Sequence, residues 1–228
     1  MTERPTALVT GASRGVGEAV ARALAPTHHV LLGGRDTEAL GKLAGELPDA
    51  RPWPVELTEV GPADVAGVER LDLLVHSAGV ALLGHVAELT ADTWRRTMEI
   101  NVVAVAELTR LLLPALRAAR GHVVCVNSGA GQRANPNWGA YAASKFALRA
   151  FADALRLEEP ELRVTTVYPG RVDTDMQRGV REQEGGAYEP DRYLRADTVA
   201  RAVLAAVNAG PDAHLTEITL RPSGGPVN

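Results

Sequence analysis

The chain alternates short apolar runs with longer stretches of helical period. Seven short runs rich in Leu or β-branched residues are separated by segments in which Ala, Leu and Arg recur with the spacing of an α-helix. Nearly continuous apolar runs are typical of strands buried on both faces, and strands that alternate with helices build parallel sheets. This pattern predicts an α/β fold with a seven-stranded, mostly parallel sheet.

The predicted elements follow from these patterns and their end signals. The strands centre on residues 7–10, 30–33, 53–57, 71–76, 122–127, 163–168 and 217–220. The helices cover residues 15–25, 37–46, 91–119, 141–158 and 197–208, with a weaker one at 61–68. Thr90 suits the N-cap of the third helix, and Pro114 should kink that helix or mark its last turns. The segment 171–195 is irregular and rich in charge and glycine, so we predict a substrate lid there.

Composition limits the possible classes of function. At 228 residues, 46% of them apolar and 4% aromatic, residues 1–228 fit a single domain with a core of Ala, Val and Leu. The net charge of −4 and the scattered arginines predict no nucleic-acid partner and no membrane partner. No apolar run suits a signal peptide or a membrane span, so we expect a cytoplasmic protein. The preference for arginine over lysine suggests a GC-rich bacterial genome.

Cysteine and metal chemistry are not expected. Cys125 is the single cysteine and lies inside the apolar run 123–126, where a buried structural thiol is expected rather than a nucleophile. No cluster of His, Cys and carboxylate residues has metal-ligand spacing, so we predict no metal.

A glycine-rich turn follows the first strand and precedes a helical pattern. The run Thr10-Gly-Ala-Ser-Arg-Gly-Val-Gly17 has glycine at positions 11, 15 and 17. Glycine is favoured where a chain reverses tightly, where its backbone approaches a pyrophosphate, and where a helix packs closely on the sheet. The helix amino terminus then offers free N–H groups to phosphates. We therefore predict a dinucleotide site here.

The end of the second strand bears on the choice of dinucleotide. An acidic side chain there holds a ribose 2′-hydroxyl, whereas an arginine accepts a 2′-phosphate. Gly34 stands at the expected acidic position, Arg35 follows, and Arg14 in the glycine turn offers a second phosphate contact. NADP(H) is therefore expected in preference to NAD(H). Asp36 complicates this expectation, because its carboxylate could face the ribose or pair with Arg35.

Tyr141 and Lys145 form the most distinctive pair in the chain. Lys145 is one of only two lysines beside 22 arginines, and helical spacing places it on the same face as Tyr141. An ammonium beside a phenol favours the phenolate and so lowers the phenol pKa. The pair alone is equally compatible with a solvated helix face.

The glycine turn, Ser128, Tyr141 and Lys145 together resemble the short-chain dehydrogenases/reductases in order and spacing, from Thr6 to about Leu220. The resemblance implies a Rossmann-like, doubly wound sheet with helices on both faces. It also implies a catalytic set of Asn101, Ser128, Tyr141 and Lys145. The cofactor contacts it implies are Gly11, Ser13, Arg14, Gly15, Val16, Gly17, Arg35, Glu56, Leu57, His76, Ala78, Gly79, Tyr141, Lys145, Pro169, Gly170, Val172 and Thr174.

Two positions depart from the family pattern. His76-Ser-Ala-Gly79 replaces the usual Asn-Asn-Ala-Gly element, and Glu56 before Leu57 stands where the family has an aspartate near the adenine. We interpret His76 as a hydrogen-bonding substitute for the asparagine rather than as an acid or base.

The resemblance implies an NADP(H)-dependent oxidoreductase that interconverts a carbonyl and an alcohol, with Tyr141 as proton donor and acceptor. The alternative is a non-catalytic NADP(H)-binding regulatory protein; a purely structural interaction protein is a third possibility. The expected partner is a small, partly apolar carbonyl or alcohol held between residues 80–83, 129–138 and 171–195. We also expect a homodimer or homotetramer assembled through the helices at 91–119 and 141–158.

Overall fold

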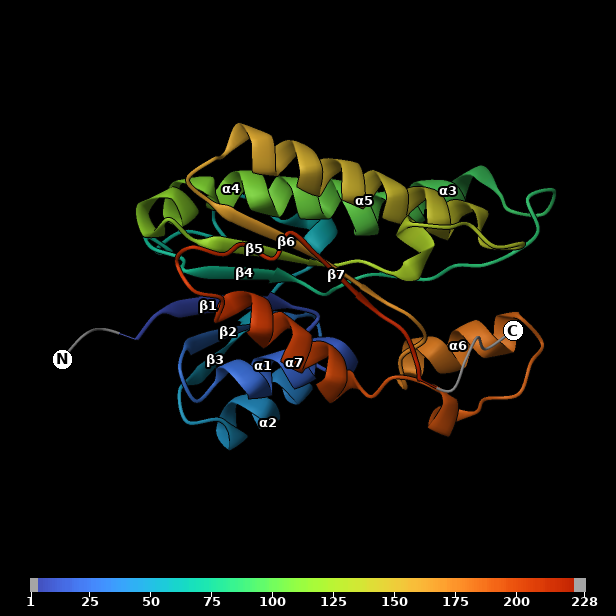
Figure 1. Ribbon diagram of the computed structural model, residues 1–228, viewed down its shortest axis with the longest axis horizontal. Helices are drawn as coiled ribbons and strands as arrows, with labels where there is room; N and C mark the ends of the chain where they lie inside the picture. Colours follow the sequence, from blue (N-terminus) through green and yellow to red (C-terminus); the bar gives the residue numbers. More distant parts are fainter. Residues whose placement is uncertain (1–3, 224–228) are drawn as a thin grey trace.

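The sheet is fully parallel. In the computed structural model, which describes residues 4–223, seven strands pair in the order β3-β2-β1-β4-β5-β6-β7 (Figure 1). All six pairings are parallel, which confirms the predicted fold class. The strands are β1 Thr6–Thr10, β2 His29–Gly34, β3 Ala50–Pro54, β4 Leu73–His76, β5 His122–Val126, β6 Arg163–Pro169 and β7 Glu217–Leu220.

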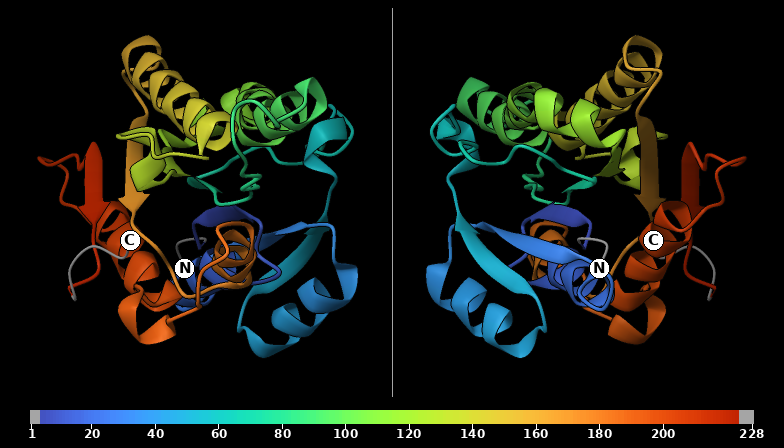
Figure 2. Two further views of the ribbon diagram at one scale, coloured as in Figure 1. Left: turned by 90° about the vertical axis from the view of Figure 1, so that its right-hand side faces the viewer. Right: turned by 90° about the vertical axis from the view of Figure 1, so that its left-hand side faces the viewer.

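Helices cover both faces of this sheet. Helices α1 (Gly15–Leu24), α2 (Thr37–Glu46) and α7 (Ala196–Val207) lie on one face, and α3 (Ala91–Met98), α4 (Ala104–Ala119) and α5 (Gly139–Glu158) lie on the other (Figures 1 and 2). Side chains alternate across the sheet, so Val9 and Val75 pack in the first core while Leu8 and Leu74 pack in the second. No helix in residues 4–223 is long and apolar enough to cross a membrane.

The third strand begins earlier than predicted. It covers Ala50–Pro54 rather than residues 53–57, and it includes two prolines. Proline is tolerated because β3 is an edge strand, where a missing N–H costs no ladder bond on the open side. As a result, Glu56 and Leu57 follow the strand instead of ending it.

Two predicted helices differ in the structure. The helix expected at 91–119 is divided into α3 and α4 by a π-helical segment, Glu99–Val103, whose wider turn interrupts the α-helical hydrogen bonding. Pro114 lies inside α4, which continues to Ala119. The weak helix expected at 61–68 is a series of turns, and Gly67 adopts a left-handed φ of 84° there.

The segment predicted to be an irregular lid contains regular structure. Helix α6 covers Asp175–Gln183 and a short 3-10 helix covers Pro190–Arg192. Thr174 caps α6 by accepting a hydrogen bond from the backbone N–H of Gln177, and Asp175 favours the first turn electrostatically. These end signals were present in the sequence, but the helix is short and strongly charged. Helix α6 stands apart from both helical layers (Figure 1).

Candidate active site

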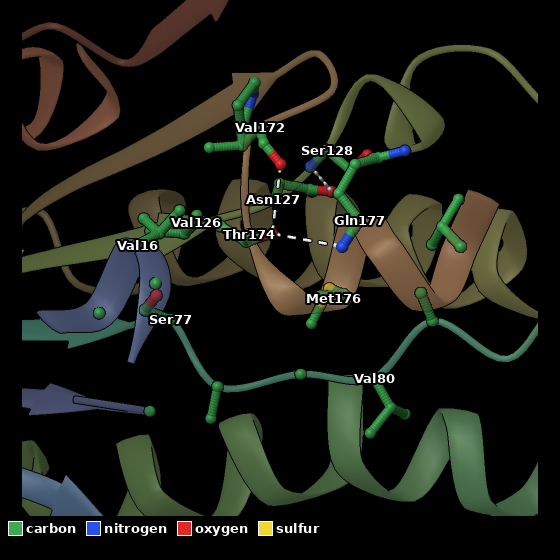
Figure 3. Close-up of a pocket in the computed structure, with 18 of the residues that line it drawn as sticks. Val16, Ser77, Val80, Val126, Asn127, Ser128, Val172, Thr174, Met176 and Gln177 are labelled. Carbon is green, nitrogen blue, oxygen red and sulfur yellow. Dashed lines mark hydrogen bonds between the residues drawn. The ribbon is translucent and has the colours of Figure 1, made fainter. Parts of the chain in front are cut away.

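A cleft of about 800 Å³ opens at the carboxyl ends of the strands. Strands β1 and β4 are neighbours although β2 and β3 intervene in sequence, so the strand order reverses here, and α/β folds bind ligands at such a point. Its volume suits a cofactor and a small molecule together. Figure 3 shows part of its wall. The cleft is lined by these residues predicted from sequence: Gly11, Ser13, Arg14, Gly15, Val16, Gly17, Arg35, Glu56, Leu57, Ala78, Gly79, Ser128, Tyr141, Lys145, Pro169, Gly170, Val172 and Thr174.

The glycine turn has the tight geometry predicted for it. Gly11 and Gly15 adopt left-handed φ values of 68° and 60°. A Cβ on Gly17 would lie 2.1 Å from the carbonyl oxygen of Gly11, so only glycine lets α1 approach the turn this closely. The Thr10 hydroxyl accepts hydrogen bonds from the N–H groups of Ser77 and Ala78 at 3.1 and 3.2 Å, which fixes the next loop against the turn.

At the end of β2, the Asp36 carboxylate does not pair with Arg35, which was one of the two roles considered for it. Its carboxylate caps α2 by accepting a hydrogen bond from the Ala39 N–H at 3.0 Å. Arg35 instead pairs with Glu56 at 3.3 Å, and its side chain is 71% exposed. The Arg35 guanidinium therefore lines the cleft and remains open to a further anion.

His76 does not reach the cleft, contrary to the prediction. Its side chain points to the α4 side of the sheet, where Nε2 lies 2.8 Å from the hydroxyl of Thr109. The residue is buried, and burial lowers its pKa to about 3, so the ring is neutral at physiological pH. His76 is thus a satisfied polar group of the core, because alternation along β4 turns it away from the cofactor side.

Tyr141 and Lys145 are both buried, which excludes the solvated helix face. They are 7% and 5% exposed, and both line the cleft. The Lys145 ammonium lies 5.8 Å from the centroid of the Tyr141 ring and also 3.4 Å from the carbonyl oxygen of Val126. Burial lowers the pKa of Lys145 to about 8.

The pKa of Tyr141 is shifted in the direction opposite to the prediction. Burial raises it, and hydrogen bonding with Ser128 opposes that shift only in part. Desolvation outweighs this hydrogen bond in the structure. Tyr141 is therefore a protonated phenol at neutral pH, held by an edge contact to the Trp138 ring at a centroid distance of 5.6 Å.

Asn101 supports the site from outside the cleft. It lies in the π-helical segment and is fully buried. Its side chain exchanges two hydrogen bonds of 2.9 Å with the backbone of Val80 and donates to the hydroxyl of Ser144 at 3.0 Å. Ser144 donates in turn to the carbonyl oxygen of Tyr141 at 2.7 Å. The Asn101 side chain thus joins the loop after β4 to helix α5, and it makes no hydrogen bond to the phenol or the ammonium.

Sequence reasoning missed Asn127, whose side chain bonds to the backbone of two members of the predicted catalytic set, Ser128 and Lys145. Its amide donates to the carbonyl oxygen of Lys145 at 3.0 Å and accepts from the Ser128 N–H at 2.8 Å. Gly131 fits beside it because a Cβ there would lie 2.6 Å from the Asn127 oxygen. A buried asparagine at a strand end gives no local signal of this role, which only the packing of β5 on α5 creates.

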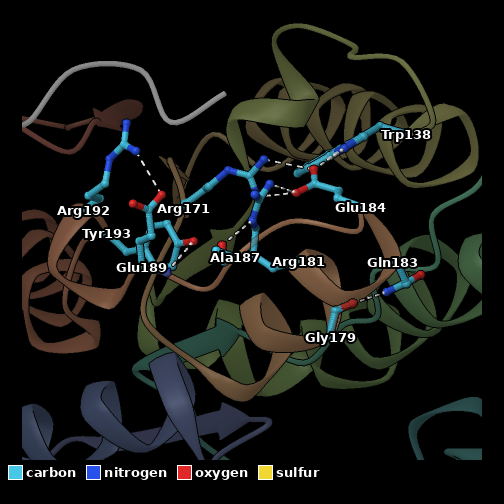
Figure 4. A network of polar contacts seen from close by, with 10 residues as sticks. All are labelled: Trp138, Arg171, Gly179, Arg181, Gln183, Glu184, Ala187, Glu189, Arg192 and Tyr193. Carbon is cyan, nitrogen blue, oxygen red and sulfur yellow. Dashed lines mark hydrogen bonds and ion pairs between the residues drawn. The ribbon is translucent and has the colours of Figure 1, made fainter.

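The segment predicted to be a lid is joined to other walls of the cleft by a polar network that sequence reasoning also missed (Figure 4). Glu184 accepts two hydrogen bonds of 2.9 Å from Arg171, one of 2.6 Å from Arg181 and one of 3.1 Å from the Trp138 indole. Next to it, the Gln183 amide accepts from the Leu83 N–H at 2.8 Å. The three predicted cavity walls are therefore tied together at the end of α6.

Other cleft residues come from segments that the sequence did not single out. Gln177 lies on the buried face of α6, and Arg221 after β7 donates to the carbonyl oxygen of Tyr168 at 3.1 Å. Both line the cleft. Among residues 4–223, no three His, Cys, Asp or Glu side chains are grouped as a metal ion would require.

Comparison with known proteins places this site in a family. Residues 5–185 match the family model described as short chain dehydrogenase. The chain is 33% identical to an uncharacterized short-chain type dehydrogenase/reductase, y4eK, of Sinorhizobium fredii, over 98% of this chain and 94% of that protein. It is 34% identical to the glycine betaine reductase ATRR of Emericella nidulans, over 97% of this chain but only 19% of that protein's length.

A solved structure shows the same fold over the whole chain. The alcohol dehydrogenase of the archaeon Thermococcus sibiricus, complexed with 5-hydroxy-NADP, is 27% identical and superimposes with a TM-score of 0.87, covering 99% of this chain and all of that one. Together with the family match over residues 5–185, the parallel sheet and the glycine-rich turn, this shows that the chain belongs to the short-chain dehydrogenase/reductase family of oxidoreductases.

Proposed function

We propose that the protein is an NADP(H)-dependent oxidoreductase that interconverts a carbonyl and an alcohol. The observation that carries the proposal is that Ser128, Tyr141 and Lys145 line the same cleft as the glycine turn. A pure nucleotide sensor would have no need of a buried phenol and a buried ammonium, each of which costs stability in an apolar setting.

The cleft fits a nicotinamide dinucleotide. Close packing at Gly11 and Gly17 leaves the backbone free to approach a pyrophosphate, and the start of α1 presents its N–H groups there. Pro169, Gly170, Val172 and Thr174 also line the cleft, where they would hold the nicotinamide. When bound, this group supplies or accepts the hydride.

The residues of the chain would supply orientation and a proton. The Ser128 hydroxyl holds the substrate oxygen, and the protonated Tyr141 phenol donates to that oxygen during reduction. Lys145 holds the nicotinamide ribose and stabilises the phenolate that forms. Asn101 acts as a positioning residue, since its side chain fixes Val80 and, through Ser144, the backbone of Tyr141.

Arg35 is the basis for preferring NADP(H). It lines the cleft beside Gly34, its guanidinium is exposed, and Asp36 is occupied in capping α2. A guanidinium suits a 2′-phosphate, and no carboxylate stands at position 34 to hold a 2′-hydroxyl. The complex of the Thermococcus sibiricus enzyme with 5-hydroxy-NADP supports the same cofactor here.

An initial-rate screen of NADPH and NADH against diverse carbonyls tests turnover and cofactor preference together. With a carbonyl that the wild type reduces, Tyr141→Phe is expected to lower kcat by at least about 100-fold while leaving NADPH affinity unchanged, because general acid catalysis contributes about that much. A folded Tyr141→Phe protein with the wild-type rate would refute the assignment. Tight NADPH binding without turnover of any carbonyl would favour the regulatory protein.

We also propose that the protein forms a homo-oligomer through α4 and α5. Val103, next to α4, is 49% exposed and Phe146 on α5 is 43% exposed, so each leaves a large apolar side chain in contact with water. Light scattering measures the oligomeric state, and Phe146→Glu is expected to shift it toward monomer. A wild-type monomer at micromolar concentration would contradict the proposal.

A further inference from the structure

Gln177 places an unpartnered amide in the wall of the cleft. The residue is 7% exposed and lines the cleft (Figure 3). Val180, one turn further along α6, is also buried and also lines the cleft. Its backbone N–H donates to the Thr174 hydroxyl at 3.3 Å. Within residues 4–223, however, its side-chain nitrogen is buried and has no hydrogen-bond partner.

An amide in this condition is unusual. Buried polar groups are nearly always hydrogen-bonded, because leaving one unpaired forfeits its hydration without return. Two other described side-chain atoms share the condition, His122 Nδ1 and Thr166 Oγ1, but neither residue lines the cleft. Among the described residues that line the cleft, Gln177 is therefore the one with a buried, unpaired side-chain polar atom.

Gln183 on the same helix shows what a structural glutamine looks like here. Its amide accepts from the Leu83 N–H at 2.8 Å and donates to the carbonyl oxygens of Gly179 and Ala81 at 2.9 and 3.2 Å. Both ends of that side chain are used to fasten α6. The Gln177 amide makes no such contact, so holding the fold together does not explain it.

The surroundings of Gln177 indicate what it would bind. Val80, Val172, Met176 and Val180 supply apolar lining to the same cleft. In the proposed function Ser128 and Tyr141 bind the reacting oxygen of the substrate, so that oxygen is not the partner of Gln177. A primary amide both donates and accepts, and rotation about its last bond exchanges the two atoms. It therefore matches a neutral carbonyl or hydroxyl oxygen.

We propose that Gln177 recognises a second oxygen-bearing group on the substrate, so that the preferred substrate is a dicarbonyl or hydroxyketone rather than a simple ketone. This inference rests on the proposed function, because it assumes that a carbonyl compound occupies the cleft. A site with a buried amide discriminates strongly against an analogue that lacks the matching oxygen, since the amide then stays unpaired.

The test compares ketones of one carbon skeleton in the full-length wild type and in Gln177→Leu. The probes are 2-hexanone and the 2,3-, 2,4- and 2,5-hexanediones, measured by kcat/KM with NADPH and by the shift in Tm that each compound causes in the presence of NADPH. Because vicinal diones are intrinsically more electrophilic, the change between the two proteins decides the test, and the ranking of ketones within one protein does not.

For at least one dione, Gln177→Leu is expected to lower kcat/KM by about 10- to 100-fold, which is the effect of losing one hydrogen bond to a buried group. The shift in Tm that this dione causes should also become smaller. The values for 2-hexanone and the affinity for NADPH should stay near those of the wild type. The Tm without ligand should be unchanged or higher in Gln177→Leu, but lower in the matched control Gln183→Leu.

Three results would overturn the inference. Equal effects of Gln177→Leu on 2-hexanone and on every dione would show that position 177 only shapes the cleft. A loss of NADPH affinity alone would assign the amide to the cofactor, and a fall in the ligand-free Tm equal to that of Gln183→Leu would assign it to the fold. Failure of the proposed function would give a different result. The dione-induced Tm shifts would still differ between the wild type and Gln177→Leu, but neither protein would oxidise NADPH.

Discussion

Replacing Lys145 with methionine should stabilise the cofactor-free protein at neutral pH. Lys145 is 5% exposed, and burial lowers its pKa from 10.5 to about 8. A pKa difference of this size between the unfolded and folded states corresponds to about 3 kcal/mol of lost stability wherever the lysine is charged in both states. Methionine has a similar length, carries no charge and fills irregular space well, so the substitution removes the penalty without leaving a large cavity.

The sign and the pH range of this effect follow from proton linkage. Between pH 8 and 10.5 the unfolded state binds more protons at Lys145 than the folded state does, so the stability of the wild type rises with pH over that range. Below pH 8 the penalty is complete. The difference between Lys145→Met and the wild type should therefore be about 3 kcal/mol at pH 7 and should vanish by about pH 10.5.

Thermal and urea unfolding at pH 7, 8, 9 and 10 measures this difference. For a chain of this length, about 3 kcal/mol corresponds to a rise in Tm of roughly 6–12 °C at pH 7. The other lysine, Lys42, is exposed on α2 and gives the matched control, because Lys42→Met should change Tm little at any of these pH values. A Lys145→Met protein with the wild-type Tm at pH 7, or with a constant difference across the range, would refute the reasoning. Lys145→Met should also lose turnover, which would separate stability from activity at this position.

Three further substitutions test other parts of the structure. Glu184→Gln removes a carboxylate shared by Arg171 and Arg181 in a mostly buried network, so we expect Tm to fall by about 4–8 °C and the substrate KM to rise with NADPH affinity unchanged. The arginines hold the pKa of Glu184 below its usual value, so the stability that the carboxylate contributes is present above pH 4.5 and is lost as pH falls through the lower folded pKa. The Tm values of the wild type and Glu184→Gln should therefore converge in acid, and a constant difference in Tm would contradict this reasoning. Gly17→Ala places a Cβ 2.1 Å from the carbonyl oxygen of Gly11, so calorimetry should show at least about tenfold weaker NADPH binding. Wild-type affinity would refute the proposed close approach of this backbone to the pyrophosphate. Arg35→Gln should raise the KM for NADPH by about tenfold and leave the KM for NADH nearly unchanged, and equal effects on both cofactors would argue against a 2′-phosphate contact.

The parts of the site that the sequence predicted are those encoded within one or two adjacent elements. The glycine turn is a local requirement of backbone geometry, and the spacing of Tyr141 and Lys145 fixes them on one face of a single helix. The wrong prediction for His76 depended on its position in the sheet. His76 stands where the family's motif has an asparagine, yet the alternation of β4 turns its side chain toward Thr109.

Other features depended on contacts between distant segments. The pKa of Tyr141 rises because tertiary packing buries it, and neighbouring residues in the sequence carry no record of that burial. The π-helical segment and the bonds of Asn101 to Val80 and Ser144 likewise join elements that are far apart in the chain.

The sequence by itself determined the parallel sheet, the glycine-rich turn and the placement of Tyr141 and Lys145 on one helix face, because strand burial, tight turns and helical spacing are short-range constraints. Only the tertiary structure decided which side chains face the cleft, how burial shifts their pKa values, and that Glu184 bonds the segment 171–195 to Trp138 while Gln177 keeps an unpaired amide. Burial and hydrogen bonding are properties of the complete packing, since each depends on every segment that surrounds a group and excludes water from it.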